Sequence, residues 1–240
     1  MVRMVNRLTI RVSRSKQAAD LELVKVVSPA PNPLRREAGL GEAKIEYAGY
    51  TEHTSLTVNQ SLGGGAQIGL WNLLQMPYPG KLLVPTYSKA APKIIFGAIP
   101  EDDLIVNDRL LCYRMRQTGA QKISLRAVAV TGRMAYLFHR GGQSMLIIRS
   151  FFVNPSGEYA DVPWDDTGDF GYAAQACCLN ATIGAFNELE YHSPAISAGT
   201  CHDTSQVWAF RGDRESIVSI IDCLISSEPV ARELLRSSQW

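Results

Sequence analysis

A short stretch near the end of the chain, Phe186–Ile196, carries two carboxylates and an imidazole at alternate positions. In a β-strand, successive side chains point to opposite faces. Glu188, Glu190 and His192 would therefore project from one face, roughly 6.5–7 Å apart, with Leu189 on the other. Two acids and a histidine on one surface can hold a sugar by its hydroxyl groups and move protons. This stretch is our first candidate for a catalytic or ligand-binding site.

Two other interpretations of the same pattern remain open. Alternating charged residues are also typical of the solvent-exposed face of an antiparallel sheet. Alternatively, Glu188, Glu190 and His192 could bind a metal ion together, because mixed oxygen and nitrogen ligands suit several metals. Pro194 brings no backbone N–H to a ladder, so we expect the strand to end before it.

The composition argues against several classes of protein. Hydrophobic residues make up 46% and charged residues 20% of the 240, as expected for a globular chain with a core. A formal net charge of +1 gives no reason to expect a nucleic-acid partner. The N-terminus lacks the apolar region of a signal peptide, and no stretch is long enough to span a bilayer. We therefore expect no membrane partner and a cytoplasmic protein.

The five cysteines suggest neither a disulfide framework nor a zinc ribbon. Their number is odd and no two have the C-x-x-C spacing. A reducing compartment is the simplest environment for them.

Short alternating segments, separated by Gly, Pro, Asn and Asp, predict an all-β fold. Regularly spaced short strands of this kind indicate an antiparallel sandwich or barrel. We expect one domain over residues 1–240, with a helical extension over 210–240. The expected strands are Leu8–Val12, Leu21–Val27, Ile45–Gly49, Ser55–Val58, Leu82–Pro85, Ile94–Phe96, Leu110–Arg116, Lys122–Val130, Met134–Phe138, Met145–Val153, Ala181–Ile196 and Val207–Phe210.

The C-terminal extension has a helical pattern. Asp213 can cap a helix whose apolar residues recur at i, i+3, i+4 and i+7 from Ile217 to Leu224. A second short helix is expected to begin around Ser227–Pro229, because proline is tolerated in a first turn.

Aromatic and polar residues elsewhere are further candidates for ligand contacts. Trp71 could stack on a sugar ring if it is exposed in a groove, and otherwise belongs to the core. Gln75, four residues later, is a candidate hydrogen-bonding group. The acidic loop Asn154–Tyr172 contains Trp164 and Asp165, which would contact a ligand if the loop closes over it. The alternative is that the aspartates of this loop only form turns.

The chain contains no complete cofactor motif. Gly63–Gly65 is followed by neither Gly-Lys-Ser/Thr nor a helical pattern, so it predicts a turn or bulge rather than a phosphate site. The acidic loop lacks the frame of an EF-hand calcium site. We expect no cofactor, and the sequence leaves the oligomeric state open.

Four features together carry a family resemblance: Gly69–Gln75, Pro85, the acidic loop around Trp164, and Phe186–Ala195. In these the chain resembles the galactose mutarotase-like (aldose 1-epimerase-like) superfamily, and more closely its bacterial branches of unassigned function than its true aldose 1-epimerases. The resemblance runs loosely from about Leu8 to Phe210. It implies a large antiparallel β-supersandwich with a carbohydrate cleft on the concave face of a sheet.

The resemblance also implies a mechanism. In aldose 1-epimerases a glutamate in a comparable Leu-Glu strand is the general base, and Leu189-Glu190 is the match, so Glu190 takes that role. The base removes the proton of the anomeric hydroxyl while an acid protonates the ring oxygen. The ring then opens, the C1–C2 bond rotates, and closure occurs on the other face. We assign the acid to His192 because it shares a face with Glu190. A free glutamate, with a pKa of about 4.3, is ionised at neutral pH.

The chain departs from the family pattern in two ways. It has no Asn-His-x-Tyr-Phe-Asn motif, so a non-catalytic carbohydrate-binding domain, or a structural domain with a vestigial cleft, is the alternative function. It is also short and its first strand begins almost at Met1. We therefore expect an N-terminal portion to be missing, and a signal peptide within that portion would change the expected location.

Overall fold

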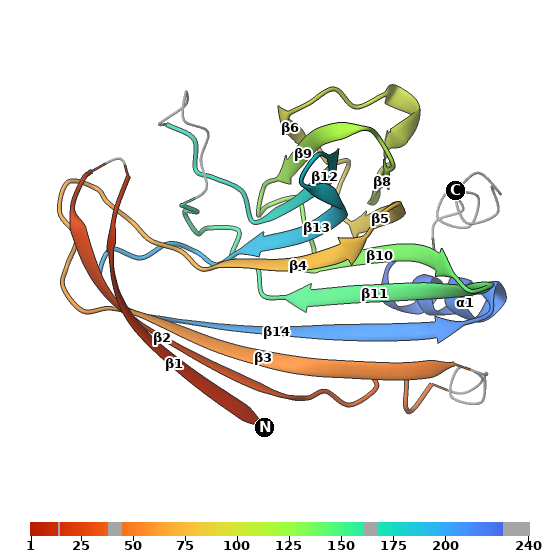
Figure 1. Cartoon of the computed structure of the whole chain (residues 1–240), viewed down its shortest axis with the longest axis horizontal. Coiled ribbons are helices and arrows are strands. Elements are labelled where there is room, and N and C mark those ends of the chain that lie inside the picture. The colour runs from red at the N-terminus through yellow and green to blue at the C-terminus, as the bar shows by residue number, and fades with distance from the viewer. Residues whose placement is uncertain (14, 38–44, 161–167, 228–240) are drawn as a thin grey trace.

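The computed structural model describes residues 1–13, 15–37, 45–160 and 168–227, which form two antiparallel sheets and a C-terminal helix. The larger sheet has nine strands in the spatial order β1-β2-β3-β14-β11-β10-β5-β8-β7 (Figure 1). In chain order they are β1 (Val2–Arg11), β2 (Ala18–Pro29), β3 (Glu46–Val58), β5 (Gly80–Pro85), β7 (Leu104–Val106), β8 (Leu110–Met115), β10 (Arg133–Arg140), β11 (Gln143–Phe151) and β14 (Gly199–Gly212). A single 3-10 turn, Glu101–Asp103, precedes β7.

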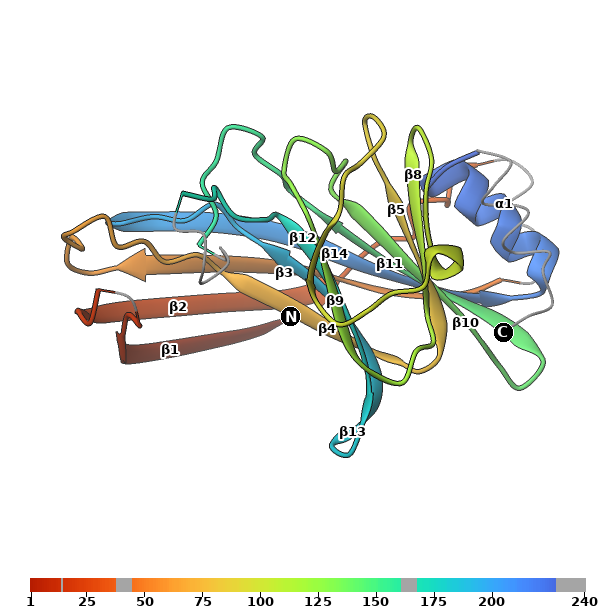
Figure 2. The same cartoon turned by 90° about the horizontal axis from the view of Figure 1, so that it is seen from above.

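The smaller sheet has five strands in the order β4-β13-β12-β9-β6. They are β4 (Trp71–Pro77), β6 (Lys93–Phe96), β9 (Gly119–Leu125), β12 (Ala174–Ala181) and β13 (Gly184–His192). This sheet crosses one part of the larger sheet, and the far halves of β1, β2, β3 and β14 project beyond it (Figure 2). The predicted all-β sandwich of antiparallel sheets is confirmed.

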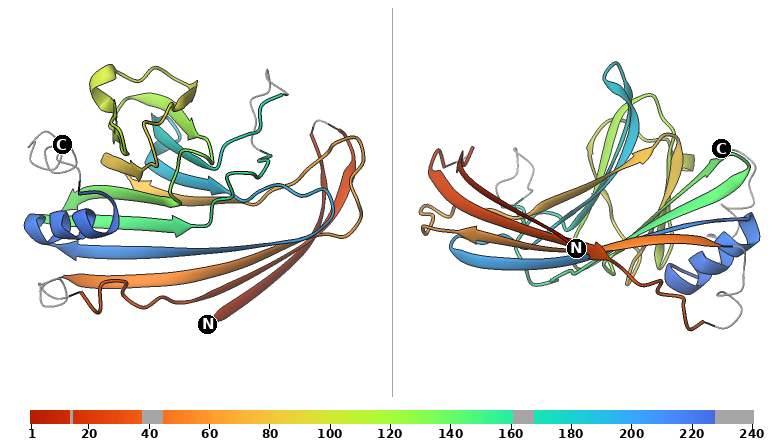
Figure 3. Two further views of the ribbon diagram at one scale, coloured as in Figure 1. Left: turned by 180° about the vertical axis from the view of Figure 1, so that it is seen from behind. Right: turned by 60° about the horizontal axis from the view of Figure 1, so that its bottom comes forward.

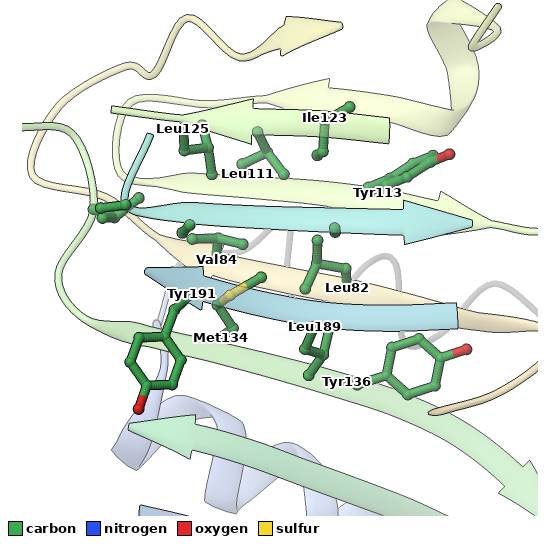
Figure 4. Close-up of a cluster of buried hydrophobic side chains, with 14 of the residues drawn as sticks. Leu82, Val84, Leu111, Tyr113, Ile123, Leu125, Met134, Tyr136, Leu189 and Tyr191 are labelled. Atoms are coloured by element: carbon green, nitrogen blue, oxygen red, sulfur yellow. The ribbon is translucent and has the colours of Figure 1, made fainter. Parts of the chain in front are cut away.

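The main core lies between the two sheets. Its side chains come from alternate positions of both, as Leu82 and Val84 of β5 and Leu189 and Tyr191 of β13 show (Figure 4). Leu82, Val84, Leu189 and Tyr191 are fully buried, and each such side chain contributes roughly 1.5–3 kcal/mol by leaving water. The alternation predicted for β13 is thereby confirmed, since Leu189 points into the core and Glu190 points away from it.

The helix α1 (Arg214–Leu224) covers part of the opposite face of the larger sheet, where it contacts β11 and β14 (Figure 3). Its apolar stripe, including Ile217 and Ile220, is buried against Leu137 and Phe210 of that face. Asp213 accepts a hydrogen bond from the backbone N–H of Ser216 at 2.8 Å, so the predicted cap is confirmed. The second helix expected from Ser227–Pro229 falls largely on residues 228–240, outside the described residues.

Several predicted strand boundaries are wrong. The two strands predicted over Ile45–Gly49 and Ser55–Val58 form one continuous strand, β3, which begins at Glu46, because the polar residues between them pair with both β2 and β14. The strand predicted over Lys122–Val130 ends at Leu125. The sequence pattern also missed β12, whose alanines and cysteines show no polar alternation because both faces are largely buried.

The glycine triplet forms a turn, as predicted. The N–H of Ala66 donates to the carbonyl oxygen of Gly63 at 3.1 Å, and Gly64 and Gly65 have φ of 62° and 72°. These positive values are readily available to glycine alone. All five cysteines are free thiols. Within the described part of the chain, no helix has the length and apolar character needed to cross a bilayer.

Candidate functional site

The outward face of the smaller sheet gathers polar side chains from four neighbouring strands. The register places Glu190 between Leu73 of β4 and Gln175 of β12, and it places Glu188 and His192 opposite Gln75 and Trp71. We call this surface the Glu190 face. Its members are Trp71, Leu73 and Gln75 of β4, Glu188, Glu190 and His192 of β13, Gln175 and Cys177 of β12, and Lys122 and Ser124 of β9.

Glu190 is held by one of its two carboxylate oxygens. Its Oε2 accepts a hydrogen bond from the indole N–H of Trp71 at 2.7 Å and from the Lys122 ammonium at 2.8 Å. Its Oε1 has no hydrogen-bond partner among the described residues, although the residue is only 1% exposed. A buried carboxylate oxygen without a partner costs free energy, and in a native protein such an atom often marks a functional site.

This environment decides between the interpretations of the alternating pattern. Glu190 and His192 are 1% and 8% exposed, so the interpretation of a solvated outer face is wrong for both. Trp71 is 58% exposed, so its interpretation as a core residue is also wrong. The structure thus places an exposed aromatic ring beside a buried carboxylate on the same face.

His192 makes a different contact from the one that its proposed acid role needs. Its Nε2 lies 3.0 Å from the Oε1 of Gln175, and the Nε2 of Gln175 donates to the Ser124 hydroxyl at 2.8 Å. With Gln175 in this orientation, the imidazole Nε2–H is the donor. The chain Ser124–Gln175–His192 crosses three strands and fixes the imidazole next to Glu190 on the strand.

The environment of Glu188 favours the protonated form of its carboxyl group. It is half-buried, and burial together with the nearby charge of Glu190 raises the pKa of its carboxyl, while Lys122 lowers it. Glu188 and Glu190 therefore differ in environment: Glu190 has a counter-charge at 2.8 Å. Two carboxylates in unlike environments can serve as acid and base in one site.

Cys177 lies opposite Glu188 in the register, but its thiol is not a nucleophile in this setting. Burial, followed by the charges of Glu188 and Glu190, raises the pKa of Cys177 to about 12. A thiol with this pKa stays protonated at neutral pH, and only the thiolate attacks or binds metals.

Three candidates from the sequence remain, Gln75, Trp164 and Asp165, and the structure describes one of them. Gln75 is exposed on β4 and, next to Glu188, can reach a ligand on the Glu190 face. Trp164 and Asp165 lie outside the described residues. Asp169, from the same acidic loop, accepts from the N–H of Gly171 at 2.8 Å, so the turn-forming interpretation is confirmed at that position.

Asp169 also ties the acidic loop to the smaller sheet. Its carboxylate accepts hydrogen bonds from both terminal nitrogens of Arg126 and lies 4.0 Å from the Lys93 ammonium. Burial raises the pKa of Asp169, but bonds from Gly171, Tyr172 and Arg126 outweigh burial and hold the pKa below its usual value.

Lys122 is the residue of the candidate site that sequence reasoning missed. It lies 68 positions before Glu190, on a strand that does not pair with β13 directly, since β12 lies between them. Because Lys122 precedes the buried residue Ile123 in the same strand, the sequence could have placed its side chain on an outward face. Nothing in the sequence shows that this face also carries Glu190. Among the described residues, no three His, Cys, Asp or Glu side chains are arranged to hold a metal ion.

The Glu190 face therefore has an acceptor without a partner among the described residues, an exposed aromatic ring and two donor groups close together. The free Oε1 of Glu190 is a hydrogen-bond acceptor, the exposed ring of Trp71 is a stacking surface, and Lys122 and Gln75 are donors beside them. No model of a known protein family matches the chain. No curated protein matches it significantly.

Proposed function

We propose that the chain is a carbohydrate-active protein of the galactose mutarotase-like superfamily, which binds a sugar on the Glu190 face. Its chemistry would be proton transfer of the aldose epimerase type, with Glu190 as general base. The observation that carries this proposal is the difference between the two carboxylate oxygens of Glu190. Oε2 accepts hydrogen bonds from Trp71 and Lys122, and Oε1 has no partner among the described residues.

The geometry supports the base role as follows. The Lys122 ammonium, 2.8 Å from Oε2, supplies a counter-charge to the buried carboxylate of Glu190. Trp71 and Lys122 together fix the orientation of the carboxyl group, which leaves Oε1 as the oxygen to accept a hydroxyl proton. A sugar ring stacked on the exposed face of Trp71 would lie beside the Glu190 carboxyl group, because the Trp71 indole donates to its Oε2.

A proton donor for the ring oxygen must also lie on this face. His192 shares the face and can donate, but it is engaged with Gln175. Glu188 has a raised pKa, so a larger share of it is protonated near neutral pH than of an ordinary glutamate. Both side chains are candidates for the acid, and substitution of each separately distinguishes them.

The alternative is a non-catalytic carbohydrate-binding domain or a structural domain with a vestigial cleft. The absence of the family's Asn-His-x-Tyr-Phe-Asn motif favours it. In a binding domain Trp71 would still stack on the sugar, and Glu190 would serve as a hydrogen-bond acceptor without proton transfer.

Anomer exchange separates the two functions. The rate at which pure α-D-galactose and α-D-glucose approach equilibrium would be followed by polarimetry with the wild type and with Glu190→Gln. Loss of catalysed exchange of at least 100-fold in Glu190→Gln is expected, because the amide is neutral and cannot take the proton. Glu46→Gln, on the exposed end of β3, is the matched control and should keep the full rate.

Full catalysed exchange in Glu190→Gln would overturn the base role. If the wild type does not accelerate exchange but binds one of the sugars, and Trp71→Ala abolishes that binding, the non-catalytic alternative holds.

A further inference from the structure

One side of β1 forms a long sheet edge without a neighbouring strand. β1 is the first strand in the spatial order of the larger sheet, and among the described residues it pairs with β2 alone. It lies at the outer margin of that sheet (Figure 2). The other terminal strands of the two sheets, β7, β4 and β6, have 3, 7 and 4 residues, whereas β1 has 10. Short edge strands protect proteins from pairing with other chains, and β1 lacks this protection.

The backbone groups of alternate residues point to this free edge. The N–H of Val12 donates to the carbonyl oxygen of Gln17 at 2.8 Å, and this pair continues the register of β1 and β2. Hydrogen-bonded and non-hydrogen-bonded pairs alternate along an antiparallel ladder, so the even-numbered residues of β1 bond to β2. The odd-numbered residues direct their N–H and C=O groups to the free edge, and these are Arg3, Val5, Arg7 and Thr9.

The side chains of β1 leave apolar surface exposed at this edge. Val2, Met4 and Val5 are 59%, 47% and 46% exposed. Alternation places Val2 and Met4 on the same face as Leu8 and Ile10, which pack partly against a small apolar cluster beside the larger sheet. A long edge strand with exposed apolar side chains is a template for pairing with another strand.

A second copy of β1 is complementary to this edge. In an antiparallel pair with a twofold axis at Asn6, residues 2–10 of the two strands face each other. Met4 then lies opposite Leu8 of the second copy, and Val2 lies opposite its Ile10. Apolar side chains therefore meet along one face of the pair, which stabilises it.

The arginines of β1 favour the same register. Arg3 lies opposite Thr9 of the second copy, whose hydroxyl bonds to the carboxylate of Asp20 on β2, and Arg7 lies opposite Val5. A shift of the second copy by two residues places Arg3 opposite Arg7 in one direction and Arg7 opposite itself in the other. Like charges directly opposite each other destabilise a strand pair, so the register with Asn6 at the axis fits best.

We propose that the chain forms a symmetric dimer through β1, in which the larger sheets of two copies join into one continuous antiparallel sheet. Arg3 and Thr9, and likewise Val5 and Arg7, exchange backbone hydrogen bonds between the copies, and Asn6 faces Asn6 in a non-hydrogen-bonded pair. A twofold pair uses the same edge of both copies, so the assembly closes at two. The dimer does not depend on the function proposed for the Glu190 face.

A cysteine at the axis tests the register. The Cα atoms of a non-hydrogen-bonded pair lie about 4.5 Å apart, which suits a disulfide. Asn6→Cys, treated with oxidised glutathione, should therefore give a covalent dimer on a gel run without reductant. Thr9→Cys is the matched control, because Thr9 is also exposed on β1 but its two copies lie about 20 Å apart along the strands. Both variants carry Cys223→Ser, since Cys223 is an exposed free thiol.

The mass in solution tests the dimer itself. Size-exclusion chromatography with light scattering should give the mass of two chains for the wild type. Val5→Pro should give the mass of one chain, because proline removes an N–H that points to the second copy and leaves the bonds to β2 in place. Val5→Thr keeps that N–H and should remain dimeric.

The outcomes are decisive in both directions. If Val5→Pro does not fold, Asn6→Asp replaces it: two carboxylates then face each other at the axis, and association should weaken at least tenfold. A monomeric wild type, or equal cross-linking of Asn6→Cys and Thr9→Cys, would overturn the proposal. A dimer that Val5→Pro and Asn6→Asp leave unchanged would place the interface elsewhere and would overturn it as well.

Discussion

Replacement of Lys122 by methionine is the sharpest perturbation of the Glu190 face. The Lys122 ammonium lies 2.8 Å from Oε2 of Glu190, and the two side chains are 18% and 1% exposed. Methionine keeps most of the volume and removes the charge. The variant therefore leaves the buried carboxylate with the Trp71 indole as its remaining donor among the described residues.

The size of the effect follows from this geometry. Two unit charges 2.8 Å apart attract by about 6 kcal/mol at an effective dielectric constant near 20, before the cost of desolvation is subtracted. Removal of one partner of a buried pair typically costs about 3–5 kcal/mol. Because water reaches the partly exposed lysine, we expect the free energy of unfolding to fall by about 3 kcal/mol at pH 7.

Urea unfolding measures this loss in the free energy of unfolding. Four proteins are compared: the wild type, Lys122→Met, Glu190→Gln and the double variant. The loss in the double variant should be about 2 kcal/mol smaller than the sum of the two single losses, because the double variant has no unpaired buried charge. An uncompensated carboxylate binds a proton more readily, so the loss in Lys122→Met should shrink when the pH is lowered from 7 to 5. Lys93→Met is the control, because the Lys93 ammonium lies 4.0 Å from the Asp169 carboxylate and the lysine side chain is 41% exposed. Its free energy of unfolding should fall by under about 1 kcal/mol. A loss in Lys122→Met as small as the control's, or strict additivity in the double variant, would refute the assigned ion pair.

Two further predictions concern the scaffold. The folded pKa of Asp169 is below its ordinary value of 3.8, so its contribution to stability is present above pH 3.8 and is lost as the pH falls through the folded value. The free energy of unfolding of Asp169→Asn should therefore fall less steeply on acidification than that of the wild type. Parallel curves of the free energy of unfolding against pH would contradict the assignment. Ile220→Ala should lower the free energy of unfolding by about 2–5 kcal/mol, because this side chain of α1 is buried against the larger sheet. Ser219→Ala, on the exposed side of the same helix, should change it by under about 0.5 kcal/mol. Equal effects of the two substitutions in denaturant melts would show that α1 does not pack as described.

Local patterns in the sequence were enough to predict the fold class. The alternation around Glu190 and the apolar spacing after Asp213 each depend on residues that are neighbours in sequence, so these elements could be predicted. Strand β12 could not, because Cys177 and its neighbours are buried on both faces and leave no polar alternation. Strand β3 was divided in two because Glu52 and Thr54 interrupt its apolar pattern, although they face the interior.

The candidate site was predictable only in part, because its contacts join distant strands. The pattern of β13 placed Glu188, Glu190 and His192 on one face. The partners Trp71 and Lys122 are 119 and 68 positions away from Glu190. Their proximity depends on the order of strands in the smaller sheet, which no local spacing encodes.

A crystal structure of the protein soaked with D-galactose and, separately, with D-glucose tests the central claim most directly. The account predicts a sugar ring over Trp71 with one hydroxyl within about 2.6–3.2 Å of Oε1 of Glu190. A sugar bound elsewhere, or Oε1 occupied by a protein group while the Glu190 face stays without sugar, would contradict it.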